Sequence, residues 1–272
     1  DNNVKKVCRY KQYFAVNKCM DRILLRDDAN TRNGVVWHTQ GSGKTLTMIM
    51  LTKMILRESR KEDSTIKRPR FVMVTDRINL DKQIRDNFIH AQMSPHRAKT
   101  GKGLIELLQD DSNTVITALV NKFEAAIKQE YCNDSKNLFL FIDEGHRTQY
   151  GKLNIYMNRV LPGAVKIAFT GTPLIQKQPK NSSRKILPAK DTYKKFGPLI
   201  DKYTLQDAID DKVTVPIVYE GRVIPQRVTS QQINAHLKHI TIGLAENARE
   251  DLEKKYSRFV AVAQSEPRLS MI

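Results

Sequence analysis

Residues 37–45 read Trp37-His38-Thr39-Gln40-Gly41-Ser42-Gly43-Lys44-Thr45, a glycine-rich turn between the apolar run Gly34–Trp37 and the helix-like segment Leu46–Leu56. A strand, a glycine-rich turn and a helix start form a phosphate cradle, because backbone N–H groups surround the phosphate and the helix dipole favours its charge. The turn therefore predicts a P-loop, in which Lys44 reaches the β- and γ-phosphates and the Thr45 hydroxyl binds Mg²⁺. The residues of this turn that we expect to bind nucleotide are Thr39, Gly41, Ser42, Gly43, Lys44 and Thr45.

The glycine-rich turn alone does not establish a nucleotide site. The full P-loop pattern has Gly where this chain has His38, and Gly-Ser-Gly-Lys-Thr can also occur by chance in a loop of a basic protein. The apolar run Leu138–Ile142 leads directly into Asp143 and Glu144. In P-loop enzymes, such a strand delivers one carboxylate to the Mg²⁺ ion and another to the attacking water. An acidic pair alone is also common on protein surfaces, but the two motifs occur in the expected order. Together they predict ATP hydrolysis, with Glu144, Lys44 and Asp143 as catalytic residues and Thr45 and Asp143 as metal ligands.

The composition favours a polyanionic partner. The 272 residues include 46 Lys and Arg against 29 Asp and Glu, which gives a net charge of +17. Nucleic acid is the first candidate, while a solvated basic surface or an acidic partner protein is the alternative. Cys8, Cys19 and Cys132 lack metal-like spacing and indicate reduced thiols in a cytoplasmic protein. No apolar run approaches the ~20 residues that span a membrane, and the chain begins at Asp1 without a secretory pattern or a Met, so we expect a piece of a longer protein.

Apolar runs and helical patterns alternate along the first part of the chain. The runs are almost continuously apolar, as in strands that are covered on both faces. The alternation predicts an α/β fold with a mostly parallel sheet and helices on both faces. Ligands bind such sheets at the C-terminal ends of the strands, where both nucleotide motifs lie. The expected strands are Val35–Trp37, Phe71–Thr75, Thr114–Ala118, Leu138–Ile142 and Val165–Phe169, and the expected helices are Lys44–Glu58, Asn79–Phe88, Asn121–Gln129 and Lys152–Val160.

Two charged segments predict loops. Arg57–Arg70 and Gln176–Lys195 both contain proline and several cations, which could contact a phosphate backbone or only solvent. Further along, Thr204–Asp210 predicts a short helix and Thr214–Tyr219 an extended run. The pattern from Gln231 to Gln264 is helical.

Three more strand ends and one upstream segment offer polar side chains. The Thr170 and Thr172 hydroxyls could bond the neighbouring Asp-Glu segment and sense the γ-phosphate, although Thr-Gly-Thr-Pro also fits a plain turn. Val74–Arg77 and Thr117–Phe123 carry side chains that suit phosphate, but they also fit ordinary helix caps. Upstream, the Gln12 amide can donate to and accept from an adenine edge, although a single Gln is most often a surface residue.

Several segments closely resemble the restriction (R, motor) subunit of type I restriction–modification enzymes, which is a superfamily-two helicase or translocase. The resemblance covers roughly residues 4–222, and His38 is usual in that family. Gly145 replaces the more frequent Ala of the Asp-Glu-Ala-His box, and it adds no side chain that could clash. The segments that carry the resemblance are Arg9–Tyr13, His38–Thr45, Asp143–Gly151, Phe169–Leu174, Phe196–Pro198, Tyr203–Thr204, Asp207–Ala208, Val215–Pro216 and Tyr219–Glu220.

The resemblance implies the first RecA-like lobe of an ATP-dependent DNA translocase that acts in the restriction of foreign DNA. It implies ATP and Mg²⁺ as cofactors, and double-stranded DNA and the modification and specificity subunits as partners. Family members also carry a nuclease domain and a second RecA-like domain with an arginine finger, and this sequence shows neither. We therefore expect the ATPase part of a type I site-specific deoxyribonuclease, nearly inactive in isolation. The implied nucleotide contacts outside the P-loop are Arg9, Gln12, Thr170 and Thr172, and the implied nucleic-acid contacts are Thr75, Arg77, Thr117, Asn121 and Lys122.

We expect an ATP-binding lobe at residues 1–222 and a C-terminal helical extension at residues 223–272. Two other functions remain open: the motor lobe of another superfamily-two repair or remodelling enzyme, and a DNA-binding module that is gated by nucleotide without hydrolysing it. Glu144 distinguishes the second of these, because a module that only binds does not need a carboxylate to orient water.

Overall fold

The computed structural model describes residues 7–25, 29–143, 150–174 and 192–216, together with His239, Ile242 and Glu246, and the side chains of residues 29, 30 and 150–153 are not described. The chain divides into two compact units, residues 1–216 and residues 217–272. The sheet and its helices belong to the first unit. Within the described segments, no helix is long and apolar enough to cross a bilayer.

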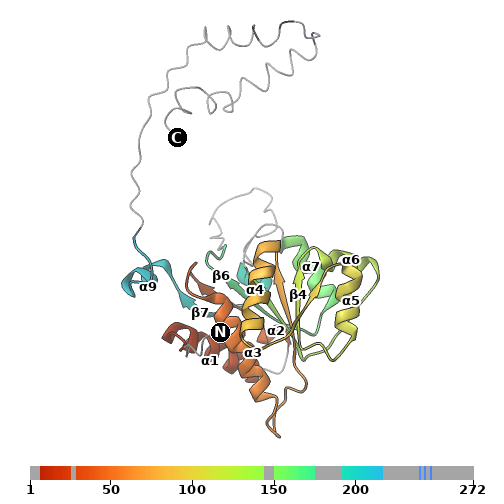
Figure 1. Ribbon diagram of the computed structural model, residues 1–272, viewed down its shortest axis with the longest axis horizontal. Coiled ribbons are helices and arrows are strands. Elements are labelled where there is room, and N and C mark those ends of the chain that lie inside the picture. The colour runs from red at the N-terminus through yellow and green to blue at the C-terminus, as the bar shows by residue number, and fades with distance from the viewer. Residues whose placement is uncertain are drawn as a thin grey trace, which may run out of the picture. The chain divides into compact units, whose positions relative to one another are not determined.

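A seven-stranded sheet forms the centre of the first unit, and every pair of neighbouring strands is parallel (Figure 1). The strands are β1 (Gly34–His38), β2 (Arg70–Thr75), β3 (Pro95–Ala98), β4 (Val115–Leu119), β5 (Leu138–Asp143), β6 (Val165–Thr170) and β7 (Leu199–Tyr203). Their order across the sheet is β3-β4-β2-β5-β6-β1-β7. The predicted parallel α/β fold is therefore confirmed.

Helices cover both faces of the sheet because its inner strands bury side chains on both sides. Along β2, Val72 and Val74 face one apolar cluster, whereas Phe71 and Met73 face the other. The first cluster includes residues of α5, α6, α7 and α8, and the second includes residues of α1, α3 and α4. The helices are α1 (Tyr10–Leu24), α2 (Ala29–Arg32), α3 (Lys44–Glu58), α4 (Ile78–His90), α5 (Gly101–Gln109), α6 (Lys122–Lys128), α7 (Tyr150–Val160), α8 (Thr192–Phe196) and α9 (Leu205–Asp210).

The five expected strands and the four expected helices are present, and the bounds of α3 are those predicted. The short helix expected at Thr204–Asp210 is α9, with Thr204 as its N-cap. The prediction of a loop at Gln176–Lys195 is wrong for residues 192–195, because α8 begins at Thr192 and packs Phe196 into the core. The expected loop at Arg57–Arg70 is shorter than predicted, since α3 reaches Glu58 and β2 begins at Arg70.

Other predictions fall largely outside the described residues. Residues 176–191 of the second expected loop are not described, nor is most of the helical pattern Gln231–Gln264. Of the extended run expected at Thr214–Tyr219, residues 214–216 form neither helix nor strand. The C-terminal helical extension and the boundary at residue 222 therefore stay predictions.

One buried lysine should make stability depend on pH. Lys166 on β6 is 2% exposed, and its Nζ donates to the Ala164 carbonyl at 3.1 Å. Burial lowers the pKa of Lys166 from 10.5 to about 8. The folded chain therefore holds this proton more weakly than the unfolded chain. Below pH about 8 the lysine is charged in both states and the full cost of burying its charge lowers stability, so the free energy of unfolding rises as the pH increases from about 8 to 10.5.

We expect Lys166→Met to remove this rise, which should be on the order of 3 kcal/mol across that window. Urea unfolding followed by the fluorescence of Trp37, the single tryptophan, measures it. The exposed Lys136 provides the matched control, Lys136→Met, which should keep the rise. An unchanged pH profile in Lys166→Met would show that Lys166 is solvated in the folded chain.

Candidate functional site

The glycine-rich turn lies between the end of β1 and the start of α3, as the P-loop pattern predicts. Gly41 and Gly43 have φ angles of +79° and +86°, a left-handed conformation that favours glycine. At Gly43 the close approach of another side chain adds a second reason. A Cβ atom there would lie 2.5 Å from Nε2 of Gln12. Both glycines therefore belong to the fold of the turn.

The turn fits a phosphate group. Ser42 is 2% exposed, and its hydroxyl has no hydrogen-bond partner among the described residues. Thr47 donates to the Gly43 carbonyl at 3.1 Å, the first backbone bond of α3, and the amides of the preceding helical residues lie at the positive end of the helix dipole. The space beside Gly41 is open, because no atom lies within 4 Å of a Cβ atom built there. A buried hydroxyl and a helix N-terminus beside an open turn suit an anion.

Lys44 lies at the mouth of the turn. Its Nζ donates to the His38 carbonyl at 3.4 Å, so the ammonium group reaches back over the loop toward the end of β1. Lys44 and Thr45 are both half-buried in the first turn of α3. The structure thus places the two residues expected to contact phosphate and metal side by side.

Gln12 joins α1 to the P-loop. Its Oε1 accepts from the Arg9 amide at 3.0 Å, and its Nε2 donates to the Gly43 carbonyl at 3.3 Å. The side chain is 4% exposed. Each end of the amide keeps one further hydrogen-bonding position, so an adenine contact is compatible with these bonds and stays a prediction.

The carboxylate and hydroxyl motifs reach the same edge of the sheet as the P-loop. β5, β6 and β1 are neighbours, with Asp143 level with Phe169 and Thr170 level with Trp37. Asp143 is 8% exposed and Thr170 is fully buried. Because these strands are parallel, Asp143 and Thr170 end beside the turn that holds Lys44. Glu144, the expected water-orienting residue, lies outside the described residues.

The Thr-Gly-Thr-Pro segment packs directly on the P-loop. The Trp37 indole Nε1 donates to the Gly171 carbonyl at 3.1 Å, and a Cβ atom at Gly171 would lie 3.2 Å from the Gln40 amide nitrogen. Thr172 donates its amide to the Thr170 hydroxyl at 3.2 Å. A movement of this segment would therefore shift its contacts with Trp37 and Gln40 in the phosphate-binding turn, which is compatible with the predicted sensing of the γ-phosphate.

A polar network around the buried His38 and Asp201 adjoins the strand end that leads into the P-loop, and the sequence did not predict it. His38 is fully buried, and its Nε2 lies 2.7 Å from Oδ2 of Asp201 on β7, while Lys18 of α1 lies 2.6 Å from Oδ1. Burial works to raise the pKa of Asp201, but the hydrogen bonds from His38 and Lys18 outweigh it and hold that pKa below its usual value. This network ties α1 and β7 to the strand end from which the P-loop departs.

The strand ends expected to contact nucleic acid differ in exposure. Thr75 and Thr117 are each 1% exposed, so their side chains do not reach the surface in this structure. Arg77 and Asn121 are exposed, and Lys122 is half-buried. The Val120 amide donates to the Thr75 carbonyl at 2.8 Å, which joins the two loops. Of the five expected nucleic-acid contacts, Arg77, Asn121 and Lys122 are therefore the ones that reach the surface.

A half-buried ion pair between α4 and β3 holds the element that follows the first of these loops. Asp81 is 1% exposed, and its Oδ2 lies 2.7 Å from Nε of Arg97 on β3. Arg97 is level with Thr117 in the ladder between β3 and β4. The pair holds the start of α4, and with it Arg77, against the strands whose ends carry the other loop.

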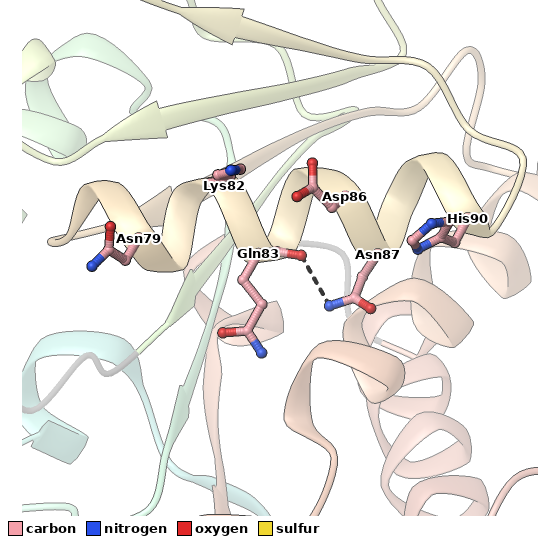
Figure 2. Close-up of a pocket in the computed structure, with 6 residues that line it drawn as sticks. All are labelled: Asn79, Lys82, Gln83, Asp86, Asn87 and His90. Atoms are coloured by element: carbon pink, nitrogen blue, oxygen red, sulfur yellow. Dashed lines mark hydrogen bonds between the residues drawn. The ribbon is translucent and has the colours of Figure 1, made fainter.

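A shallow hollow of about 470 Å³ lies on the outer face of α4, away from these motifs. Figure 2 shows that its lining residues all come from this one helix, and that Asn87 Nδ2 donates to the Gln83 carbonyl at 2.9 Å. A single polar helix face encloses no ligand. The lining residues are Asn79, Lys82, Gln83, Asp86, Asn87 and His90.

Comparison with known proteins agrees with this geometry. The sequence profile of the SWI2/SNF2 ATPase family matches residues 11–250. The chain belongs to the SWI2/SNF2 ATPase family. The Hef helicase domain of Pyrococcus furiosus, a solved structure, has the same fold with a TM-score of 0.51 at 15% identity, covering 86% of this chain and 44% of that one.

The relatives of this SWI2/SNF2 ATPase chain are endonuclease subunits of type I restriction enzymes. The HindI subunit of Haemophilus influenzae is 33% identical over 80% of this chain and 21% of its own length. A Methanocaldococcus jannaschii protein, whose name also describes such a subunit (MjaIXP), is 29% identical over 98% of this chain and 25% of its own length. The resemblance seen in the sequence is confirmed, and the chain spans a quarter or less of these relatives.

Proposed function

We propose that this chain is the ATP-binding motor lobe of a type I restriction endonuclease R subunit, which binds ATP–Mg²⁺ and the backbone of duplex DNA. The observation that carries the proposal is the common sheet edge. The P-loop with its buried Ser42 hydroxyl, Asp143 and the Thr170 segment all meet there. The names and family of the relatives agree with it.

ATP–Mg²⁺, when bound, would supply the phosphoanhydride bond whose hydrolysis drives movement along DNA. In this proposal Lys44 neutralises the β- and γ-phosphates, and Thr45 and Asp143 hold the metal. Glu144 orients the attacking water. The loop residues Thr39, Gly41, Ser42 and Gly43 surround the phosphates. Arg9 and Gln12 contact the adenine. Thr170 and Thr172 contact the γ-phosphate and couple its presence to the loops that face DNA.

The partners follow from the relatives and from the charge. The relatives are subunits of larger enzymes, so the proposed assembly includes modification and specificity subunits, double-stranded DNA and the remainder of a longer R subunit. Its cellular role would be the restriction of foreign DNA. The proposed location is the cytoplasm, where the free cysteines Cys8, Cys19 and Cys132 would stay reduced.

We expect the chain to bind duplex DNA weakly, through phosphates and without base recognition. Non-specific binding has a Kd of roughly 10⁻⁴–10⁻⁶ M at physiological salt, and its logarithm changes linearly with the logarithm of salt concentration. Arg77→Ala with Lys122→Ala should weaken binding to all sequences and reduce the salt slope by about 1 for each phosphate that the protein no longer neutralises. Fluorescence titrations with unrelated duplexes measure both effects.

The control for this double variant is Lys136→Ala. Lys136 is exposed and precedes β5, so it lies at the amino ends of the strands, opposite to Arg77 and Lys122. This variant should leave the slope unchanged. A strong preference for one short sequence, or an affinity that ignores salt, would mean that the domain recognises DNA by its bases and that the backbone role is misassigned.

A further inference from the structure

A second hollow lies between the C-terminal ends of α3 and α4, and the nucleotide site does not use it. Its volume is about 360 Å³. Ligand pockets in proteins run from roughly 300 to 1,000 Å³, so it can take a few side chains but not a folded surface. Its lining includes three cations, Lys53, Arg57 and Arg60, and three apolar residues, Leu56, Ala91 and Met93.

The three cations have no anionic partner in the part of the chain that the structure describes. Lys53 and Arg57 are four residues apart at the end of α3, Arg60 lies in the turn that follows the helix, and all three are exposed. Among the described residues no carboxylate lies within ion-pair distance of any of them, although the neighbouring Lys61 pairs with Glu58 at 2.7 Å. None of the described residues that line the hollow is acidic. Three like charges around one hollow repel one another, so an anionic occupant would be stabilised there.

The floor between these cations is apolar and continuous with the core. Leu56, Ala91 and Met93 are partly buried and pack against the cluster under α3 and α4. Methionine adapts its shape to different apolar partners. A phosphate backbone has no side chain to place on such a floor, whereas a peptide with a short apolar anchor among carboxylates matches both the floor and the rim.

The rim of the hollow is formed before anything binds. The turn after α4 is closed by bonds from the Gln92 amide to the Ile89 carbonyl at 2.9 Å and from the Met93 amide to the Phe88 carbonyl at 3.0 Å. Gln92 has a φ of +61°, which reverses the chain into β3. A preformed site avoids part of the ordering cost of binding.

The hollow is also separate from the nucleotide site. In a parallel sheet the connecting helices run back, so the C-terminal ends of α3 and α4 lie at the amino edge of the strands. The P-loop, Asp143 and Arg77 lie at the opposite, carboxyl edge. An occupant of the hollow would therefore leave the ATP and DNA surfaces open.

We propose that this basic hollow docks a segment of a partner protein, an acidic peptide that inserts a short apolar anchor between Leu56 and Met93. Carboxylates on either side of that anchor meet Lys53, Arg57 and Arg60. The interaction is electrostatic at the rim and apolar at the centre, so it weakens with salt but is not abolished by it.

The test uses the fluorescein-labelled peptide Glu-Glu-Asp-Leu-Phe-Glu-Glu and the whole chain labelled with ¹⁵N. Anisotropy measures affinity, and amide shifts locate the site, which should be confined to residues 53–60 and 91–93. Arg57→Glu with Arg60→Glu should weaken binding by about tenfold or more, because two exposed charge pairs turn repulsive. Lys136→Glu reverses one exposed charge at the same amino ends of the strands and should leave binding unchanged.

Two further probes decide between occupants. Replacing Leu-Phe by Ser-Ser in the peptide should weaken binding several-fold, because the apolar anchor is removed. Short duplex DNA should not shift residues 53–60. The proposal is overturned if the peptide does not bind at millimolar concentration, if the Ser-Ser peptide binds as well as the original, or if DNA binds in the hollow and loses affinity in the double variant.

Discussion

Lys44→Ala should reduce ATP–Mg²⁺ affinity by about 10²-fold or more, and isothermal calorimetry on the whole chain should detect little heat. The half-buried Lys44 ammonium lies at the mouth of the P-loop, within reach of the His38 carbonyl at 3.4 Å. Hydrogen bonds to charged groups contribute roughly 1.5–3 kcal/mol each, and the proposed role gives Lys44 two phosphates to meet. Each 1.4 kcal/mol is about tenfold in affinity.

Two variants make this result specific. Lys53→Ala removes an exposed lysine from the same helix and should keep wild-type affinity. Glu144→Gln should also keep affinity while it blocks hydrolysis in the full-length enzyme, because the proposed role of Glu144 concerns the water. Binding is the readout for the isolated chain, since an arginine finger supplied from elsewhere contributes about 10³–10⁵ in rate. Equal losses in Lys44→Ala and Glu144→Gln would contradict the separate roles.

The sequence predicted the centre of the fold better than its edges. Strands such as β5 are buried on both faces, so their continuous apolar runs are visible without the structure. The two missed strands, β3 and β7, are the outermost strands of the sheet. β3 reads Pro-His-Arg-Ala and β7 reads Leu-Ile-Asp-Lys-Tyr, because a strand with one neighbour can keep charged side chains at its surface.

The helices α1, α2, α5 and α8 were also not predicted, and α5 was missed for a different reason. It begins Gly101-Lys-Gly, and glycine is unfavourable in helices. A Cβ atom at Gly101 would overlap the Ala125 Cβ of α6, so the glycine allows the two helices to approach. A tertiary contact overrides local propensity here, and no pattern within α5 reveals it.

Some residues of the candidate site could be predicted from the sequence and others could not. The P-loop, Asp143 and Thr170 were predictable, because each is a local motif at a strand end. The His38–Asp201 pair was not, since it joins residues far apart in sequence, one of them on a strand that had no apolar signature. The burial of Thr75 and Thr117 was equally invisible, because a strand-end threonine can point to either face.

Arg70, the first residue of β2, carries the other large effect, and this one concerns stability. It is 7% exposed, and its guanidinium group makes five hydrogen bonds at the end of α5. Four of them reach backbone carbonyls, two in the last turn of α5, where carbonyls lack an intrahelical partner, and two in the segment that follows it. The acceptors are the carbonyls of Leu107, Leu108, Asp110 and Asn113, at 2.7–3.1 Å, and Oδ1 of Asp111 at 2.8 Å.

Arg70→Met should therefore lower the free energy of unfolding by roughly 3–5 kcal/mol. It removes the donor to the Leu108 and Asn113 carbonyls and one of the donors that the Leu107 and Asp110 carbonyls share with Asn113. Arg70→Lys should recover only a small part, since an ammonium group cannot reproduce the planar fork. Arg60→Met, an exposed arginine with no anionic partner among the described residues, should change stability by less than about 0.5 kcal/mol. Urea unfolding followed by Trp37 fluorescence compares the three variants. If Arg70→Lys were as stable as wild type, the charge alone would matter and the forked geometry would not be what joins α5 to the sheet.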